Sequence, residues 1–142
     1  MTSPAPRLAT VPRLNGVRVL IAEDEPDVRK LVAATLEGAG AAVIAVSSAE
    51  AALQVVLAER PDVLVSDLAM PDKGGYWLIG QVRALPPERG GATPAAALTG
   101  LTGSAHRVTA LRAGFQFHVE KPLGVMDLVG IVAILARKDD AG

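Results

Sequence analysis

The stretch "DVLVSDLAMPDKGG", residues 62–75, decides the fold of this chain. Its first five residues, 62–66, form a short apolar run that predicts a buried strand. Asp67 follows at once, and a proline and two glycines then interrupt any regular structure. An acidic residue therefore directly follows a predicted buried strand. Its role has to be inferred from the rest of the sequence.

The chain has the length of one ordinary domain. Its 142 residues suffice to bury a core without disulfides or metal ions. Half of the residues are apolar and only four are aromatic (Trp 1, Tyr 1, Phe 2), so small aliphatic side chains should fill the interior. The prolines and arginines of residues 1–16 predict a flexible leader or linker. We expect the domain to cover residues 17–138, with a short tail at residues 139–142.

Composition excludes several classes of function. The formal net charge of -1 and the lack of a basic stripe argue against binding to nucleic acid or to anionic membranes. The absence of cysteine excludes disulfides, thiolate metal sites and cysteine catalysis, and it favours a reducing compartment, so we expect a cytoplasmic protein. The longest strongly apolar run, residues 128–136, is far shorter than the roughly 20 residues that cross a bilayer.

Short apolar runs alternate with segments of helical spacing from Val17 onward. Continuous apolar strands that alternate with helices indicate a parallel sheet covered on both faces. We therefore predict an α/β fold, a flavodoxin-like, doubly wound, five-stranded parallel sheet with five helices. The predicted strands are residues 17–22, 41–46, 62–66, 94–98 and 117–119, and the predicted helices are residues 26–38, 47–59, a segment after 75, 104–113 and 123–137. Ser47 and Glu50 have the spacing of a capping box for the second helix.

In such a sheet, ligands bind beyond the carboxyl ends of the strands. The residues found there are Glu23, Asp24, Asp67, Thr99 and Lys121. Three crowded carboxylates repel one another unless a cation neutralises them, and a site with only oxygen ligands favours Mg²⁺. A carboxylate beside such an ion can attack phosphorus and form an acyl phosphate, which an ammonium and a hydroxyl can stabilise. This chemistry explains the acid at position 67.

The motifs also resemble a known family. "VLIAEDEPDVR" (19–29), "DVLVSDLAMPDKGGY" (62–76), "ALTG" (97–100) and "AGFQFHVEKPL" (113–123) follow in the order and spacing of a two-component response-regulator receiver domain. The resemblance covers residues 17–137. "ALPPERGG" (84–91), together with "AGFQFHVEKP" (113–122), is similar to receivers attached to hybrid histidine kinases.

The resemblance implies a role for each residue of the site. Asp67 would be the phosphoacceptor, and Glu23 and Asp24 would be the acidic pair that binds Mg²⁺ or Mn²⁺ together with Asp67 and the backbone carbonyl of Ala69. Thr99 would be the switch hydroxyl and Lys121 the ammonium that contacts the phosphoryl group. The peptide between Lys121 and Pro122 is commonly cis in the family. The implied partner is a histidine kinase or a histidine phosphotransfer protein.

Three positions depart from the common pattern of the family. Gly100 follows Thr99 where a small Ala is usual. Glu23 replaces the commoner Asp of the acidic pair. His118 occupies the position where a Tyr or Phe usually swings inward on activation. We expect His118 either to be the coupled side chain, which makes the output sensitive to pH near neutrality, or to be an ordinary half-buried residue.

Two further features predict a partner surface. Trp77 falls off the apolar stripe of its helix, and we expect either a half-covered surface aromatic or a contact residue. The last helix has no charge from 128 to 136, and its helical spacing predicts that Val129, Gly130, Ala133 and Ile134 face away from the core. The family often dimerises through its fourth helix, fifth strand and fifth helix, here residues 104–113, 117–119 and 123–137, so we expect a homodimer there. The alternative is an exposed, alanine-rich helix.

Three functions remain open at this stage. The first is a receiver that Asp67 phosphorylation switches, which is not a turnover enzyme on an external substrate. The second is a pseudo-receiver that keeps the fold and acts as a constitutive interaction or dimerisation module. The third, a phosphohydrolase with Asp67 as nucleophile, would need a second acid two residues on, where this chain has Ala69.

Overall fold

A computed structural model describes residues 13–100, 104–121 and 125–137. Within these ranges the chain forms one parallel sheet in the order β2-β1-β3-β4-β5. The strands are β1 (Arg18–Ala22), β2 (Ala42–Val46), β3 (Val63–Asp67), β4 (Ala95–Thr99) and β5 (Phe117–Glu120). The helices are α2 (Pro26–Gly38), α3 (Ala49–Glu59), α4 (Gly75–Arg83), α5 (Ser104–Ala113) and α6 (Val125–Ala136), with a short 3-10 helix η1 (Pro87–Arg89). The predicted doubly wound, flavodoxin-like fold is confirmed.

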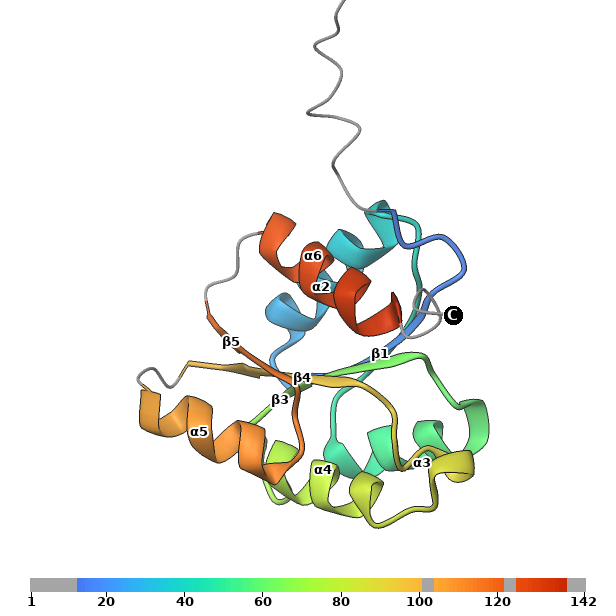
Figure 1. Cartoon of the computed structure of the whole chain (residues 1–142). Helices are drawn as coiled ribbons and strands as arrows, with labels where there is room; N and C mark the ends of the chain where they lie inside the picture. The colour runs from blue at the N-terminus through green and yellow to red at the C-terminus, as the bar shows by residue number, and fades with distance from the viewer. Residues whose placement is uncertain (1–12, 101–103, 122–124, 138–142) are drawn as a thin grey trace, which may run out of the picture.

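The helices cover both faces of the sheet (Figure 1). α2 and α6 lie on one face, and α3, α4 and α5 lie on the other. Each face has its own apolar core because successive side chains of a strand point to opposite sides of a sheet. On β3, for example, Val65 belongs to the core beneath α2 and α6, whereas Leu64 belongs to the core beneath α3, α4 and α5.

Local signals set the starts of α2 and α3. α2 begins at Pro26, where a proline costs nothing because the first amides of a helix have no intrahelical acceptor. α3 is capped by Ser48, whose Oγ accepts a hydrogen bond of 3.1 Å from the amide of Ala51. The predicted capping box that began at Ser47 is therefore wrong by one residue, and Glu50 lies in the first turn without the capping role.

The chain just before β1 belongs to the core. Leu14 is only 1% exposed, packs beneath α2 and α6, and donates its amide to the carbonyl of Ala39 at 2.8 Å. The packed domain therefore begins before the predicted boundary at residue 16, since an apolar side chain in this short segment adds to the core. The rest of the predicted leader, residues 1–12, and the predicted tail at residues 139–142 lie outside the described residues.

α6 corrects one part of the predicted partner surface. Val129 is 3% exposed and lies in the core with Leu128 and Val132, whereas Ile134 is 53% exposed. Positions 128, 129 and 132 share one face of a helix, so Val129 lies on the inward face and its predicted outward position is wrong. Gly130 and Ala133 are half-buried. The outward surface of α6 is therefore narrower than predicted.

Arg83 joins two loops at the amino end of the sheet. Its Nη1 donates to the carbonyls of Gly91 (3.0 Å) and Thr93 (2.7 Å), just before β4. Its Nε and Nη2 donate to the carbonyl of Gly114 (3.0 and 2.8 Å), just before β5, and Nη2 also reaches Gln116 Oε1 at 3.3 Å. Every one of these acceptors is neutral. Burial lowers the pKa of Arg83 from its ordinary value, and the neutral acceptors offset this cost.

None of the helices in the described ranges has the length and apolar character needed to span a bilayer.

Candidate metal centre

The carboxyl ends of the strands bring the site together. Glu23 and Asp24 directly follow β1, Asp67 is the last residue of β3, and Thr99 is the last residue of β4. Lys121 follows β5, and its amide donates to the carbonyl of Thr99 at 2.8 Å. β3 lies between β1 and β4 in the sheet, so Asp67 is at the centre of this edge.

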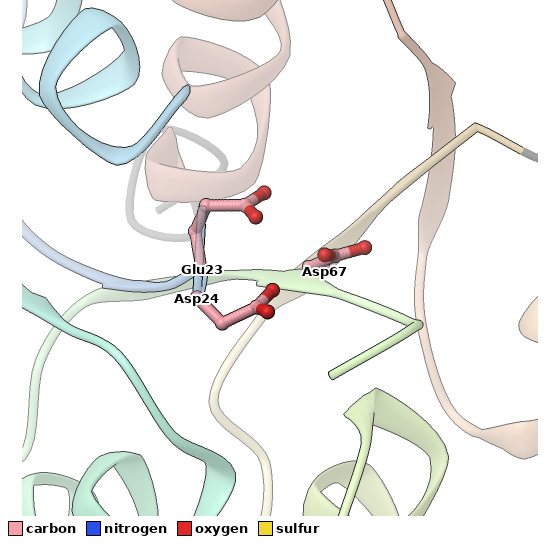
Figure 2. A group of neighbouring side chains, drawn as sticks. All are labelled: Glu23, Asp24 and Asp67. Carbon is pink, nitrogen blue, oxygen red and sulfur yellow. The ribbon is translucent and has the colours of Figure 1, made fainter. Parts of the chain in front are cut away.

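Three carboxylates converge at this edge (Figure 2). One oxygen atom from each of Glu23, Asp24 and Asp67 lies within 4.8 Å of the other two. Glu23 is fully buried and Asp67 is 4% exposed, whereas Asp24 is half-buried at the mouth of the site. Carboxylates so close together and so poorly hydrated repel one another strongly.

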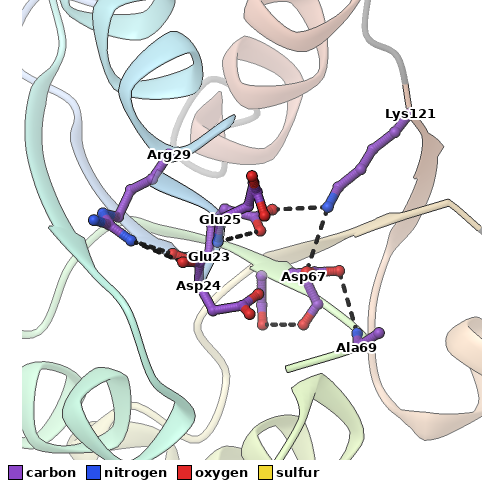
Figure 3. A network of polar contacts seen from close by, with 8 residues as sticks. Glu23, Asp24, Glu25, Arg29, Asp67, Ala69 and Lys121 are labelled. Carbon is purple, nitrogen blue, oxygen red and sulfur yellow. Dashed lines mark hydrogen bonds and ion pairs between the residues drawn. The ribbon is translucent and has the colours of Figure 1, made fainter. Parts of the chain in front are cut away.

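Lys121 supplies the balancing charge from the other side (Figure 3). Its Nζ lies 2.9 Å from Glu23 Oε1 and 3.3 Å from Asp67 Oδ2. The other oxygens of these carboxylates accept backbone hydrogen bonds: Glu23 Oε2 from the amide of Glu25 at 3.1 Å, and Asp67 Oδ1 from the amide of Ala69 at 3.2 Å. Lys121 therefore holds two carboxylates at once, and Asp24 makes no ion pair with the described residues.

The pKa values follow from this geometry. Burial raises the pKa of Glu23 above its ordinary value, and repulsion from Asp67 adds to the rise, although Lys121 and the Glu25 amide oppose it. Burial alone would lower the pKa of Lys121, but its contacts with Glu23 and Asp67 outweigh burial and raise that pKa. The ammonium therefore stays charged at neutral pH. Its single positive charge does not neutralise the three carboxylates.

The donor atoms fit a hard divalent cation. Only oxygen atoms converge, and two of the three carboxylates are almost withdrawn from water. Among the residues that the structure describes, Lys121 is the one cation that pairs with them. Mg²⁺ prefers one or two carboxylates and keeps several waters, and Mn²⁺ accepts the same ligands. Such an ion would neutralise the excess negative charge and leave coordination positions for phosphate oxygens. Glu23, Asp24 and Asp67 are the residues that would hold it.

The structure places most of the predicted site residues at this edge. Thr99 is 1% exposed at the end of β4. Ala69 is exposed in the loop after β3, and its amide, which the sequence analysis did not consider, contacts Asp67. Whether the Ala69 carbonyl binds a metal stays a prediction, and Pro122 lies outside the described residues.

His118 lies on β5, three residues before Lys121. Its side chain is half-buried, and neither ring nitrogen has a hydrogen-bond partner among the described residues, although both nitrogens are buried. Together with Leu111, Gln116, Phe117 and Arg107 it lines a pocket of about 340 Å³ between α5 and β5. The predicted switch role of His118 stays a prediction.

Two residues near the site were missed in the sequence analysis. Arg29 of α2 donates to the backbone carbonyls of Glu23 and Asp24, and Lys73 lies between Glu50 (3.4 Å) and the ring of Trp77, 5.5 Å from its centroid. Trp77 is half-buried against the core of α3, α4 and α5, which agrees with the half-covered alternative. The one sequence feature that could have indicated a role for Arg29 is its position in the first turn of the helix that follows the acidic pair.

Comparison with known proteins agrees with this geometry. Residues 19–133 match the family model described as the response regulator receiver domain. The chain is 41% identical over 114 residues to an uncharacterised 14.6 kDa protein of Leptolyngbya boryana, covering 80% of this chain and 86% of that protein. It is 32% identical over 123 residues to the transcriptional regulatory protein KdpE of Mycobacterium tuberculosis, covering 87% of this chain but only 52% of KdpE.

Among solved structures, the chain is similar to the receiver domain of the sensor histidine kinase PA1611 from Pseudomonas aeruginosa. The two share 27% sequence identity with a TM-score of 0.77, and the match covers 85% of this chain and 98% of that one. In that protein a magnesium ion is coordinated in the active site cleft. The family match, the sheet order and the acidic edge agree, and this chain belongs to the response-regulator receiver family of two-component signal transduction.

Proposed function

We propose that this chain is a phosphoacceptor receiver domain in which cation-dependent phosphorylation of Asp67 switches a protein-interaction surface. The observation that carries the proposal is the buried cluster of Glu23, Asp24 and Asp67 with Lys121 in contact with two of the three acids. A scaffold has no use for three crowded carboxylates, because each buried charge lowers stability.

The chemistry follows from the positions of these groups. A carboxylate oxygen of Asp67 attacks phosphorus, an O–P bond forms, and the N–P bond of a phosphohistidine donor breaks. The electron pair of the broken bond goes to the leaving imidazole nitrogen, which takes a proton from solvent. Lys121 and Thr99 would then contact the new phosphoryl oxygens, and Glu23, Asp24 and Asp67 would hold an Mg²⁺ or Mn²⁺ ion that offsets the charge of these oxygens. The donor is a histidine kinase or a histidine phosphotransfer protein, and the reaction takes place in the cytoplasm.

The proposal is tested by intact mass after incubation with acetyl phosphate and Mg²⁺. We expect one phosphoryl adduct on the wild type, none on Asp67→Asn, and none on the wild type in EDTA. The variant Asp72→Asn, which changes an exposed acid of the next loop, is the matched control and should form the adduct normally. A folded wild type that forms no adduct with any small donor would favour the pseudo-receiver. Release of free phosphate at a turnover rate would favour the phosphohydrolase.

The interaction surface includes α5, β5 and α6. Val108 and Leu111 of α5 and Ile134 of α6 are large apolar side chains that are between 42% and 53% exposed. We infer that this surface forms a homodimer in which Gly130 and Ala133 allow close approach, while Trp77 contacts the phosphoryl donor near the site. Sedimentation that shows a monomer at high protein concentration, with and without a phosphate mimic, would contradict the dimer.

His118 is the residue through which we expect the site to reach this surface. Its two buried ring nitrogens lack hydrogen-bond partners among the described residues, so few polar contacts oppose a rotation of the ring. His118→Phe should therefore change the shift in dimerisation or partner affinity that phosphorylation causes. An equal shift in the wild type and in His118→Phe would contradict this role.

A further inference from the structure

We infer that Arg29 is a positioning residue that fixes the acidic pair for divalent cation binding. The inference rests on the proposed function, since it assumes that Glu23, Asp24 and Asp67 bind the cation. Arg29 Nη1 donates to the backbone carbonyl of Glu23 at 2.9 Å and to that of Asp24 at 3.3 Å. Both bonds are made by one nitrogen of a half-buried side chain on α2.

The loop between β1 and α2 needs such support. The segment has three residues, 23–25, and its amino end is held by the bond from the Glu23 amide to the carbonyl of Val46 (3.0 Å). The helix start gives little further support, because Glu25, its N-cap residue, makes no side-chain capping bond. Without Arg29, the carbonyls of both acidic residues would keep no polar contact within the described parts of the chain.

The placement of the contacts matters as much as their number. In Figure 3, the guanidinium of Arg29 reaches the loop from the side away from Asp67. The peptide carbonyls are held from that side, which leaves the side chain of Asp24 free to point toward Asp67. Arg29 makes no ion pair with any described carboxylate, so it contacts the backbone of the acidic pair and leaves the ligand oxygens unoccupied.

The positive charge of Arg29 opposes the binding of a metal cation at the site. A cation near the first turn of a helix opposes the helix dipole, and a cation beside a metal site repels the metal. These two effects predict that removal of the Arg29 charge should strengthen cation binding. Loss of the backbone contacts predicts the opposite, because a loop that moves cannot hold its ligands at the distances that Mg²⁺ requires. The sign of the change therefore separates the two roles.

The test is a calorimetric titration of the full chain with Mg²⁺ and, separately, with Ca²⁺. We expect Arg29→Met to bind Mg²⁺ about 10-fold more weakly than the wild type, since loss of a group that orients a ligand costs that much. Ca²⁺ accepts irregular coordination, so its affinity should fall only about 3-fold. Arg29→Lys keeps a donor and the charge, and it should recover at least half of the lost binding free energy.

The matched control is Lys30→Met, which removes the same charge from the next residue of α2. Lys30 is exposed and makes no polar contact with the described parts of the chain. This variant should bind Mg²⁺ as the wild type does or slightly more tightly. If Arg29→Met proves unfolded by its thermal transition, Arg29→Gln takes its place with the same expected loss.

Three results would overturn the inference. The first is Mg²⁺ binding by Arg29→Met that equals or exceeds that of the wild type, and the second is an equal change in Arg29→Met and Lys30→Met. The third is an equal loss for Mg²⁺ and Ca²⁺, which would indicate general damage to the site. A wild type that binds neither cation would overturn the proposed function as well, so the two failures are distinguishable.

Discussion

Two cationic side chains hold loops together at opposite ends of the sheet, and they do so in opposite ways. At the amino end, Arg83 donates only to neutral oxygens, three carbonyls and one amide. At the carboxyl end, Lys121 contacts two buried carboxylates while a third lies within 4.8 Å of both. At the amino end, every N–H group of the Arg83 guanidinium has a hydrogen-bond acceptor. At the carboxyl end, the three carboxylates carry more negative charge than Lys121 neutralises.

The difference indicates that the contacts at the amino end of the sheet stabilise the fold, whereas the groups at the carboxyl end bind ligands and react. A buried donor whose hydrogen bonds are all made contributes to folding and has no reason to bind anything else. A cluster with uncompensated charge is destabilised until a ligand supplies the missing charge, and the free energy of that compensation is available for binding. Removal of groups at the two ends should therefore change stability in opposite directions.

The largest effect is expected at the amino end. Arg83→Met should lower the free energy of unfolding by about 3 kcal/mol, because it leaves the carbonyls of Gly91, Thr93 and Gly114 without their donor. Urea unfolding measures the change. Arg89→Met, which removes an exposed arginine on η1, should stay within about 0.5 kcal/mol. The Mg²⁺ affinity of folded Arg83→Met should equal that of the wild type, and a large loss there would contradict the separation of the two ends.

At the carboxyl end, Glu23→Gln should stabilise the metal-free chain by roughly 1 kcal/mol at neutral pH, since it removes one buried charge and keeps the contact of Lys121 with Asp67. The pKa of Glu23 is raised above its ordinary 4.5 in the folded chain, so the unfolded chain releases this proton first as the pH rises. Wild-type stability therefore falls relative to that of the variant above about pH 4.5.

Unfolding of both proteins in EDTA from pH 4 to pH 8 gives the measurement. The advantage of Glu23→Gln should grow with pH and then level off above the folded pKa. An advantage that shrinks as the pH rises would contradict the raised pKa. Glu25→Gln, an exposed acid two residues away, should show no such gain.

The smallest effect is expected when the amino end is made to resemble the carboxyl end. Gln116→Glu places a carboxylate where Gln116 Oε1 now accepts from Arg83 Nη2 at 3.3 Å and from the Ala95 amide at 2.7 Å. Because this side chain is exposed, the gain should be about 0.5 kcal/mol or less. It should vanish in 1 M salt. Thermal unfolding at low and high salt measures it, and a gain that survives high salt would mean that this pair is more buried than the structure indicates.

Much of the fold could be predicted because its signals are local. The strands are continuous apolar runs, and the one predicted as 94–98 is observed as β4 (Ala95–Thr99). Errors arose where neighbours were chemically alike. Ser47 and Ser48 can both cap a helix, and only the structure selects Ser48. In α6, no polar residue from 128 to 136 marks the outer face, so the burial of Val129 could not be predicted from the sequence.

The site could be predicted only as a set of positions. The rule that strand ends share an edge brings Glu23, Asp24 and Asp67 together without any structure. The rule does not give which oxygen Lys121 contacts, because that depends on side-chain length and rotamer. The rule does not predict the contacts of Arg29 either. A hydrogen bond to a backbone carbonyl depends on the path of the loop, and every residue type has such a carbonyl.

The contact between Lys73 and Trp77 has an optical consequence. The chain has a single tryptophan, so its intrinsic emission comes from one indole, which lies half-buried on the helix that follows the Asp67 loop. The ammonium of Lys73, 5.5 Å from the ring centroid, lies in that loop and contributes to the electric field at the indole. A movement of this loop alters that field and with it the emission maximum or intensity. The emission of Trp77 should therefore report changes at the acidic site without an added label.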